Sequence, residues 1–230
     1  LLSTTPMFLK TSLRTLALSL ALALPLSPYA SEPPGEIEEI VTPGADDDEI
    51  YTVWTRVRDG FKIPNMENSV VDENLAKYSK RPDYLQRMAN RSQKYLYHII
   101  EEVTARGMPT EIALLPFVES AFVTNAKSRV KAAGLWQFMP ATGREFGLEV
   151  NDNIDERYNV EKATVAACKY FKQAYAKYGD WMAVSAAYNA GQGRISSQLD
   201  QQLASHAMDL WLVEETSRYM FRLLAVKEIF

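Results

Sequence analysis

Apolar residues recur at helical spacing through most of the chain from about residue 48 onward. The clearest case is 160–178, where Val160, Ala167 and Phe171 share a face and Gly179 ends the pattern. A 3.6-residue period closed by glycine is typical of an amphipathic helix. No convincing strand-length alternation of apolar and polar residues is found, and there is no internal repeat. The pattern therefore predicts a predominantly helical, all-α fold.

The same spacing, bounded by residues typical of helix ends, predicts further helical segments. A polar, turn-like stretch at 151–159 precedes the helix just described. The segment at 70–80 is compatible with a helix or an extended piece. The other helices are expected over 48–61, 83–107, 140–147, from Asp180 to an abrupt end near Gly191, and 211–230.

One more helix is expected from Thr110, a candidate N-cap, but a proline interrupts it. Proline in a helix interior costs about 3 kcal/mol, so the helix either restarts or kinks at Pro116. In both cases Glu119 lies near a helix C-terminal end. There the negative end of the helix dipole disfavours an ionised carboxylate.

The first part of the chain has the features of a targeting signal rather than those of a folded domain. Lys10 and Arg14 precede an apolar run from Leu16 to Leu26, and small residues follow at Ala30. This order is that of a secretory signal peptide, so we assign residues 1–31 to one, with 1–6 as a misread start. No cysteine follows the apolar run, so a lipid anchor is not expected. The expected location is the periplasm, with membrane attachment left open.

The rest of the chain divides by composition. Residues 32–49 are rich in proline and acidic side chains, which predicts a disordered acidic linker. We expect an N-terminal helical extension over 50–107 and a catalytic domain over 108–230. The last helix has no cap or polar tail, so we expect the natural protein to continue past Phe230.

Composition narrows the classes of function. The 230 residues carry a formal net charge of −4 with no basic block, which disfavours a nucleic-acid binder. With His98 and His206 as its histidines and Cys168 as its single cysteine, the chain predicts no metal site, cofactor or intrachain disulfide. Cys168 is expected to be a small buried apolar residue, and the protein a monomer.

Candidate chemistry gathers between Leu114 and Ala141. Glu119 follows Phe117 and Val118 and precedes Ala121 and Phe122. Apolar neighbours raise the pKa of a carboxyl group, and a carboxylic acid that keeps its proton near neutral pH can act as a general acid. The alternative is a helix-surface glutamate beside core residues.

Three motifs in this order resemble the lytic transglycosylases of the soluble-transglycosylase type, which have a goose-lysozyme-like helical fold. They are Glu119-Ser120 with Ser128 nine residues beyond the glutamate, then Gly134-Leu135-Trp136-Gln137-Phe138-Met139-Pro140, then Ala187-Tyr188-Asn189-Ala190-Gly191. The stretches ALLPFVESAF, GLWQFMPATG and ETSRYMF extend the resemblance over nearly all of the chain beyond the linker. The export signal agrees with it independently, because peptidoglycan lies outside the cytoplasm.

The resemblance implies roles for individual residues. Glu119 matches the single catalytic glutamate, and Ser128 a serine that contacts the sugar or orients the acid. Gln137 and Met139 match groove residues next to the cleaved bond. Tyr188 matches a tyrosine near the catalytic carboxyl. Asn189 matches a residue that supports the loop or touches a sugar amide.

The implied activity is cleavage of the N-acetylmuramic acid–N-acetylglucosamine bond of peptidoglycan strands, with formation of 1,6-anhydro ends. Ordinary glycosidases use two carboxylates roughly 5 to 9.5 Å apart. The other candidates here, Glu111, Glu145, Asp155 and Glu156, lack the apolar setting of Glu119. We therefore favour one acid; the alternatives are a lysozyme-like hydrolase and a non-catalytic wall-binding domain.

For several residues a structural role competes with these. Trp136 and Phe138 are candidates for core packing, and at least one of them is expected to be core. Gln137 is either a buried hydrogen-bonded amide or a sugar contact, and Tyr188 is alternatively a core tyrosine. For Asp155 to Arg157 we favour a structural ion-pair turn.

Overall fold

The structure is a computed structural model, and it describes residues 52–202, 207 and 214–230. The predicted signal peptide and acidic linker lie outside the described residues. Within them the chain forms α-helices, short 3-10 helices and turns, with isolated β-bridges but no strand. The all-α prediction is confirmed for this part of the chain. The elements are α1 (Val53–Asp59), α2 (Ser69–Ser79), α3 (Pro82–Thr104), η1 (Thr110–Leu114), α4 (Leu115–Glu119), α5 (Pro140–Glu145), η2 (Glu156–Tyr158), α6 (Val160–Tyr178), α7 (Trp181–Ala190), α8 (Gln192–Gln202) and α9 (Glu214–Ile229).

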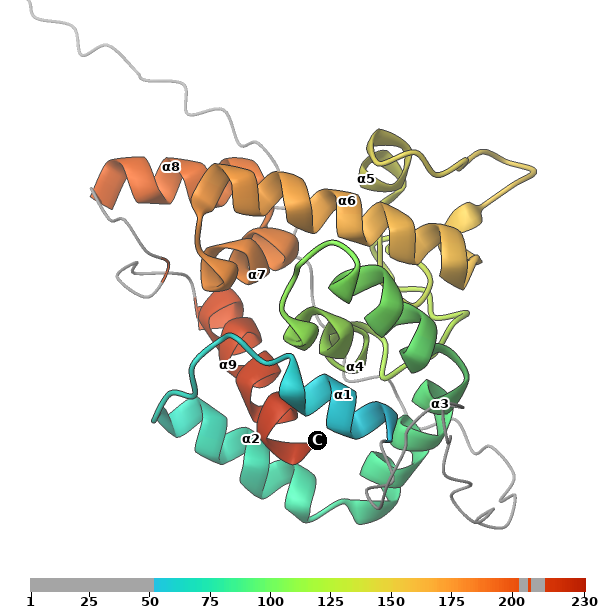
Figure 1. The fold of residues 1–230 in the computed structure, drawn as a ribbon. Coiled ribbons are helices and arrows are strands. Elements are labelled where there is room, and N and C mark those ends of the chain that lie inside the picture. The colour runs from blue at the N-terminus through green and yellow to red at the C-terminus, as the bar shows by residue number, and fades with distance from the viewer. Residues whose placement is uncertain (1–51, 203–206, 208–213) are drawn as a thin grey trace, which may run out of the picture.

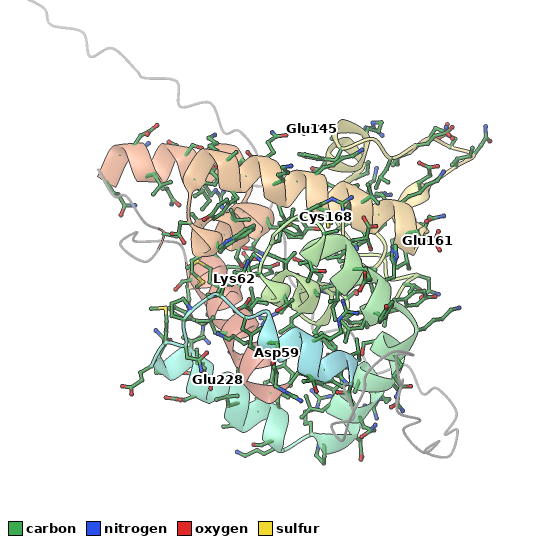
Figure 2. The ribbon with its side chains drawn as sticks, viewed as in Figure 1. Asp59, Lys62, Glu145, Glu161, Cys168 and Glu228 are labelled. Carbon is green, nitrogen blue, oxygen red and sulfur yellow. The ribbon has the colours of Figure 1, made fainter. Side chains whose placement is uncertain are left out.

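Helix α6 shows why the pattern predicts it so well. The Asn159 side chain accepts a hydrogen bond from the backbone N–H of Lys162, which caps the first turn. Gly179 ends the helix in the left-handed conformation with φ of +64°, which glycine adopts without steric cost. Cys168, in the middle of α6, is fully buried as expected, and Figure 2 labels its position on the helix.

The segment around Pro116 resolves the ambiguity in the sequence. The 3-10 helix η1 ends at Leu114, and α4 begins at Leu115 with the proline in its first turn, where no backbone N–H is needed. Glu119 is the last residue of α4, as predicted. The prediction of Thr110 as an N-cap is wrong, because Pro109 holds that position and makes no side-chain cap. The Thr110 hydroxyl instead donates to the carbonyl of Val57, 2.5 Å away.

The pattern misses one helix boundary. Gly191 ends α7 as predicted, but the chain turns at once into α8, which the sequence does not predict as a separate helix. Most side chains of α8 are polar, and Ile195 is its one buried residue. The helix therefore lacks the apolar stripe on which such a prediction depends.

The helices pack around two contiguous hydrophobic clusters. The larger one is built mainly from α1, α3, η1, α4, α6 and one face of α9, and the smaller one mainly from α2, α7, α8 and another part of α9. Figure 1 shows α6 crossing one side of the molecule and α9 running beside α2 toward α1. Helix α9 also packs on η1, α4 and α7, so the last described helix contacts elements from α2 to α7.

A long irregular loop, residues 121–139, connects α4 to α5. It is held by isolated bridges that pair Ala133 with Lys127 and with Phe138. The loop carries both Ser128 and the second sequence motif. Its conformation therefore decides what faces the glutamate.

Candidate active site

Glu119 is half-buried at the end of α4, next to the buried Phe117. The hydroxyl of Tyr219, on α9, donates a hydrogen bond to Glu119 Oε1 over 2.5 Å. The adjacent Ser120 is buried, and its hydroxyl donates to the carbonyl of Leu135 over 2.9 Å. The carboxyl is thus fixed from α9, and the residue after it is tied to the 121–139 loop.

Burial raises the pKa of Glu119 to about 7, while the hydrogen bond from Tyr219 and the charge of Arg222 act in the opposite direction. Loss of hydration destabilises the ionised carboxylate more than these two groups stabilise it. Glu119 therefore holds its proton on a substantial fraction of molecules near neutral pH. A group in that state can donate a proton and later take one back.

Tyr188, near the end of α7, is predicted to lie near the catalytic carboxyl, and it is close enough to Glu119 to respond to its charge. Burial and then the charge of Glu119 raise the pKa of Tyr188 well above that of free tyrosine. Its hydroxyl donates to the carbonyl of Trp136 over 2.6 Å, and its ring packs 4.9 Å from that of Phe171. Tyr188 thus joins α6, α7 and the 121–139 loop beside the acid, and it serves packing as well as the site.

The aromatic pair of the second motif is core. Trp136 is fully buried and donates from Nε1 to the Thr164 hydroxyl over 3.0 Å, and Phe138 is 3% exposed. The expectation that at least one of them is core is therefore met by both.

Gln137, between them, is half-buried with φ of +51°. Its amide nitrogen donates to the carbonyls of Gly134 at 2.7 Å and Ala126 at 3.3 Å, so Gln137 is bonded to its own loop. Its amide oxygen accepts no hydrogen bond from the described residues.

Three further residues are predicted to contact the substrate: Ser128, Met139 and Asn189. The Ser128 hydroxyl accepts a hydrogen bond from the backbone N–H of Ala132 at 2.9 Å, inside the loop. Met139 is 42% exposed at the start of α5, and Asn189 is half-buried on α7 directly after Tyr188. Within the described chain, the hydrogen bond to the Glu119 carboxyl comes from Tyr219 and from none of these three side chains. Their predicted contacts with a sugar remain predictions.

The other candidate carboxylates are engaged elsewhere or lie at the periphery. Glu111 is fully buried and accepts hydrogen bonds from the backbone of residues 62 and 63. Asp155 pairs with Arg157 at 2.7 Å, which confirms the predicted ion-pair turn, and Glu156 pairs with Lys162. Figure 2 shows Glu145 on α5, at the outer edge of the molecule and away from α4.

Sequence reasoning misses Tyr219 and Arg222, the two groups on α9 that act on Glu119. They lie one helical turn apart and 100 or more residues from the glutamate. The stretch that contains Tyr219, ETSRYMF, carries part of the family resemblance, but nothing in it singles out the tyrosine as a partner of the acid. The polar Tyr219 side chain within an apolar helix face is the available signal.

Neither a metal centre nor a membrane-spanning helix is present within the described ranges, 52–202, 207 and 214–230. No group of three histidine, cysteine, aspartate or glutamate side chains there could hold a metal ion. No helix in those ranges is both long and apolar enough to cross a membrane.

The fold and this site define a helical protein with one raised-pKa carboxyl set among aromatic rings, the type of centre that acid–base catalysts use. Residues 97–209 match the family described as Transglycosylase SLT domain. The chain is 37% identical over 182 residues to membrane-bound lytic murein transglycosylase D of Escherichia coli K12. That match covers 77% of this chain and 40% of the relative's length, so the chain spans about two fifths of that protein.

Two further proteins match parts of the chain. Peptidoglycan transglycosylase gp16 of Escherichia phage T7 is 37% identical over 114 residues, covering 48% of this chain and 8% of that protein. An inactive mutant of lytic transglycosylase Slt from Pseudomonas aeruginosa is 29% identical with a TM-score of 0.47, over 57% of this chain and 23% of that one. Residues 97–209 therefore form a transglycosylase SLT domain.

Proposed function

We propose that the protein is a lytic transglycosylase that cleaves the glycan strands of peptidoglycan. The observation that carries the proposal is the half-buried carboxyl of Glu119, which accepts a hydrogen bond from Tyr219 and has a pKa of about 7. It lies within the residues that match the transglycosylase SLT domain. The substrate is the bond between N-acetylmuramic acid and N-acetylglucosamine.

In the first step protonated Glu119 donates its proton to the glycosidic oxygen, and the bond from that oxygen to the anomeric carbon breaks. The acetamido group of the muramyl sugar stabilises the positive charge at this carbon. In the second step the C6 hydroxyl oxygen of the same sugar attacks the carbon, and its proton passes to the Glu119 carboxylate. The product is a 1,6-anhydro end, the acid is regenerated, and no water is consumed.

A single carboxyl is sufficient for these two steps because the attacking C6 hydroxyl and the anomeric carbon belong to the same sugar. Their proximity is therefore built into the substrate. Among the described residues, the charged side chain that shifts the pKa of Glu119 is the cation Arg222, and no second carboxylate contributes. A hydrolase of the two-carboxylate type would need one within roughly 5 to 9.5 Å to act as nucleophile or to activate water. The candidate carboxylates Glu111, Asp155 and Glu156 are engaged in other hydrogen bonds or ion pairs, which supports intramolecular attack.

The other predicted residues have roles on the substrate side. We propose that Ser128, Gln137 and Met139 line the groove next to the cleaved bond, and that Tyr188 and Asn189 contact the sugar from α7. The exposed side chain of Met139 and the open amide oxygen of Gln137 support these placements. We also propose that residues 50–107 form an extension to a catalytic domain at 108–230, and that the protein is a monomer exported to the periplasm.

The test is mass spectrometry of the fragments that the protein releases from purified peptidoglycan. We expect fragments that lack one water relative to hydrated muropeptides and resist borohydride reduction. Reducible, hydrated products would make the protein a hydrolase, and the absence of products would favour a binding domain.

The matched variant is Glu119→Gln, which keeps the side-chain shape and removes the acid. We expect it to lose at least about a hundredfold in rate, the lower range for general acid catalysis. Its far-UV circular dichroism should match the unaltered protein. Retention of more than a few per cent of the activity would contradict the assignment of Glu119.

A further inference from the structure

The 121–139 loop contains an unusual run of backbone conformations. Lys131, Gly134 and Gln137 have φ values of +70°, +77° and +51°, at every third position. For lysine and glutamine this left-handed conformation is disfavoured by contact between Cβ and the following carbonyl. Strained residues persist only where the surrounding structure over-determines them, and they cluster at functional sites.

One side chain contacts this loop at both ends of the run. Arg157 is 5% exposed, and its terminal nitrogen donates to the carbonyl of Lys131 over 2.6 Å and to that of Phe138 over 2.8 Å. The first carbonyl belongs to a left-handed residue, and the second follows Gln137. The main chain of Arg157 lies against Gly134, where an added Cβ would fall 1.8 Å from the Arg157 oxygen.

Arg157 is itself held by Asp155. Its Nε donates to one carboxylate oxygen at 2.8 Å, and its second terminal nitrogen donates to the other at 2.7 Å. This two-point pairing fixes the guanidinium plane while the first nitrogen serves the loop. An ammonium group on a flexible chain cannot reproduce this arrangement of donors.

We propose that Arg157 is a positioning residue that sets the conformation of the loop carrying Ser128 and Gln137, and thereby the shape of the substrate groove opposite Glu119. This inference rests on the proposed function. Glu119 has a separate support, because its hydrogen bond comes from Tyr219 on α9. Disturbing Arg157 should therefore change strand binding while the hydrogen bond from Tyr219 to Glu119 stays in place.

The experiment compares Arg157→Lys with the unaltered protein on soluble peptidoglycan glycan strands. We expect the KM to rise about tenfold, because small displacements of binding groups are costly, while the basic pKa of the kcat–pH profile stays in place. The control is Lys162→Ala, which breaks the ion pair with Glu156 in the same turn and leaves the loop untouched. It should leave the KM within about twofold, the level expected for loss of an exposed pair.

A second variant separates positioning from general stability. Glycine adopts positive φ freely, so Lys131→Gly removes one strained residue that Arg157 stabilises. In the Arg157→Lys background it should recover part of the melting temperature, because the strain is gone. It should not restore the KM, because the loop still lacks its two hydrogen bonds.

A fall in melting temperature with an unchanged KM would overturn the inference and leave Arg157 a purely structural residue. A shift of the basic pKa in Arg157→Lys would overturn it as well. Strand affinity of the Glu119→Gln protein, measured with and without Arg157→Lys, gives the same comparison without turnover. Failure of the unaltered protein to cleave strands would therefore count against the proposed function, and equal affinities of these two proteins against the inference.

Discussion

At the scale of single residues, the state of Glu119 depends on a balance that one hydroxyl can change. Burial raises its pKa, whereas the hydrogen bond from Tyr219 stabilises the ionised form and lowers it. Tyr219→Phe removes that bond and keeps the ring. The pKa of Glu119 should then rise further, and the alkaline fall of kcat/KM should move to higher pH by about one unit.

The control is Tyr170→Phe. Tyr170 is also buried, and its hydroxyl donates to the carbonyl of Ala187 over 2.8 Å, without contact to Glu119. It should lower stability by about 1 kcal/mol and leave the pH profile where it was. Equal displacement of both profiles would show that packing, rather than the Tyr219 hydroxyl, sets the pKa.

The raised pKa also predicts how the stability of the folded protein varies with pH. Glu119 titrates near 4.5 in the unfolded chain and at about 7 in the folded one, so the folded state binds more protons between these values. Its contribution to stability is therefore fully present below about pH 4.5 and is lost as the pH rises through about 7. Glu119→Gln, which cannot ionise, should gain roughly 2 to 3 kcal/mol over the unaltered protein at pH 8 relative to pH 4.

Urea unfolding of both proteins at pH 4, 6 and 8 measures this difference directly. The comparison uses the change with pH, which cancels any constant effect of the amide. A difference that does not vary with pH would mean that Glu119 titrates near its ordinary pKa, and the proposed acid would lose its physical basis.

At the scale of elements, the loop can approach η2 closely because the residue at the contact, Gly134, has no side chain. At Gly134 an added Cβ would lie 1.8 Å from the carbonyl oxygen of Arg157, and the φ of +77° is unfavourable for any other residue. Gly134→Ala should therefore destabilise the protein by roughly 3 kcal/mol or more. Gly179, with φ of +64° and no atom within 4 Å of its added Cβ, is the matched control.

Gly179→Ala should cost only about 1 to 2 kcal/mol, the conformational term alone. Thermal unfolding of the two variants gives the comparison. Equal losses would indicate that the loop moves away from η2 to accept the methyl group. In that case the contact would not be a rigid part of the site.

The elements also differ in how far the sequence predicts them. Helix α6 is predicted at the right residues because its cap, its apolar period and Gly179 are all local signals. The position of Glu119 at the end of α4 follows from Pro116 in the same way. The Tyr219 contact has no local signal, because α9 reaches α4 only through tertiary packing. The fold class and the catalytic acid can therefore be predicted from local sequence. The groups that shift the pKa of the acid cannot, because they approach it only in the folded protein.

At the scale of the whole molecule, a buried ion pair joins distant parts of the described chain. Lys227 on α9 lies 3.4 Å from Glu111 on η1, and both are buried. Glu111 also accepts hydrogen bonds from the backbone N–H groups of Lys62 and Ile63, and Lys227 donates to the carbonyl of Ile63. Nearby, the ring of Phe230 stacks on Trp54 with centroids 4.7 Å apart.

These contacts predict that the segment from α1 to α3 and the rest of the described chain unfold together rather than as two units. Lys227→Met removes the cation and leaves a buried carboxylate with only its backbone donors, which should cost about 3 to 5 kcal/mol. Urea unfolding followed by tryptophan fluorescence and by far-UV circular dichroism should still give coincident transitions, shifted together. The double variant Glu111→Gln/Lys227→Met should recover part of the loss, because no unpaired charge is left inside. Separate transitions would mean that the N-terminal helices are an independent unit and that α9, with Tyr219, could hold Glu119 without them.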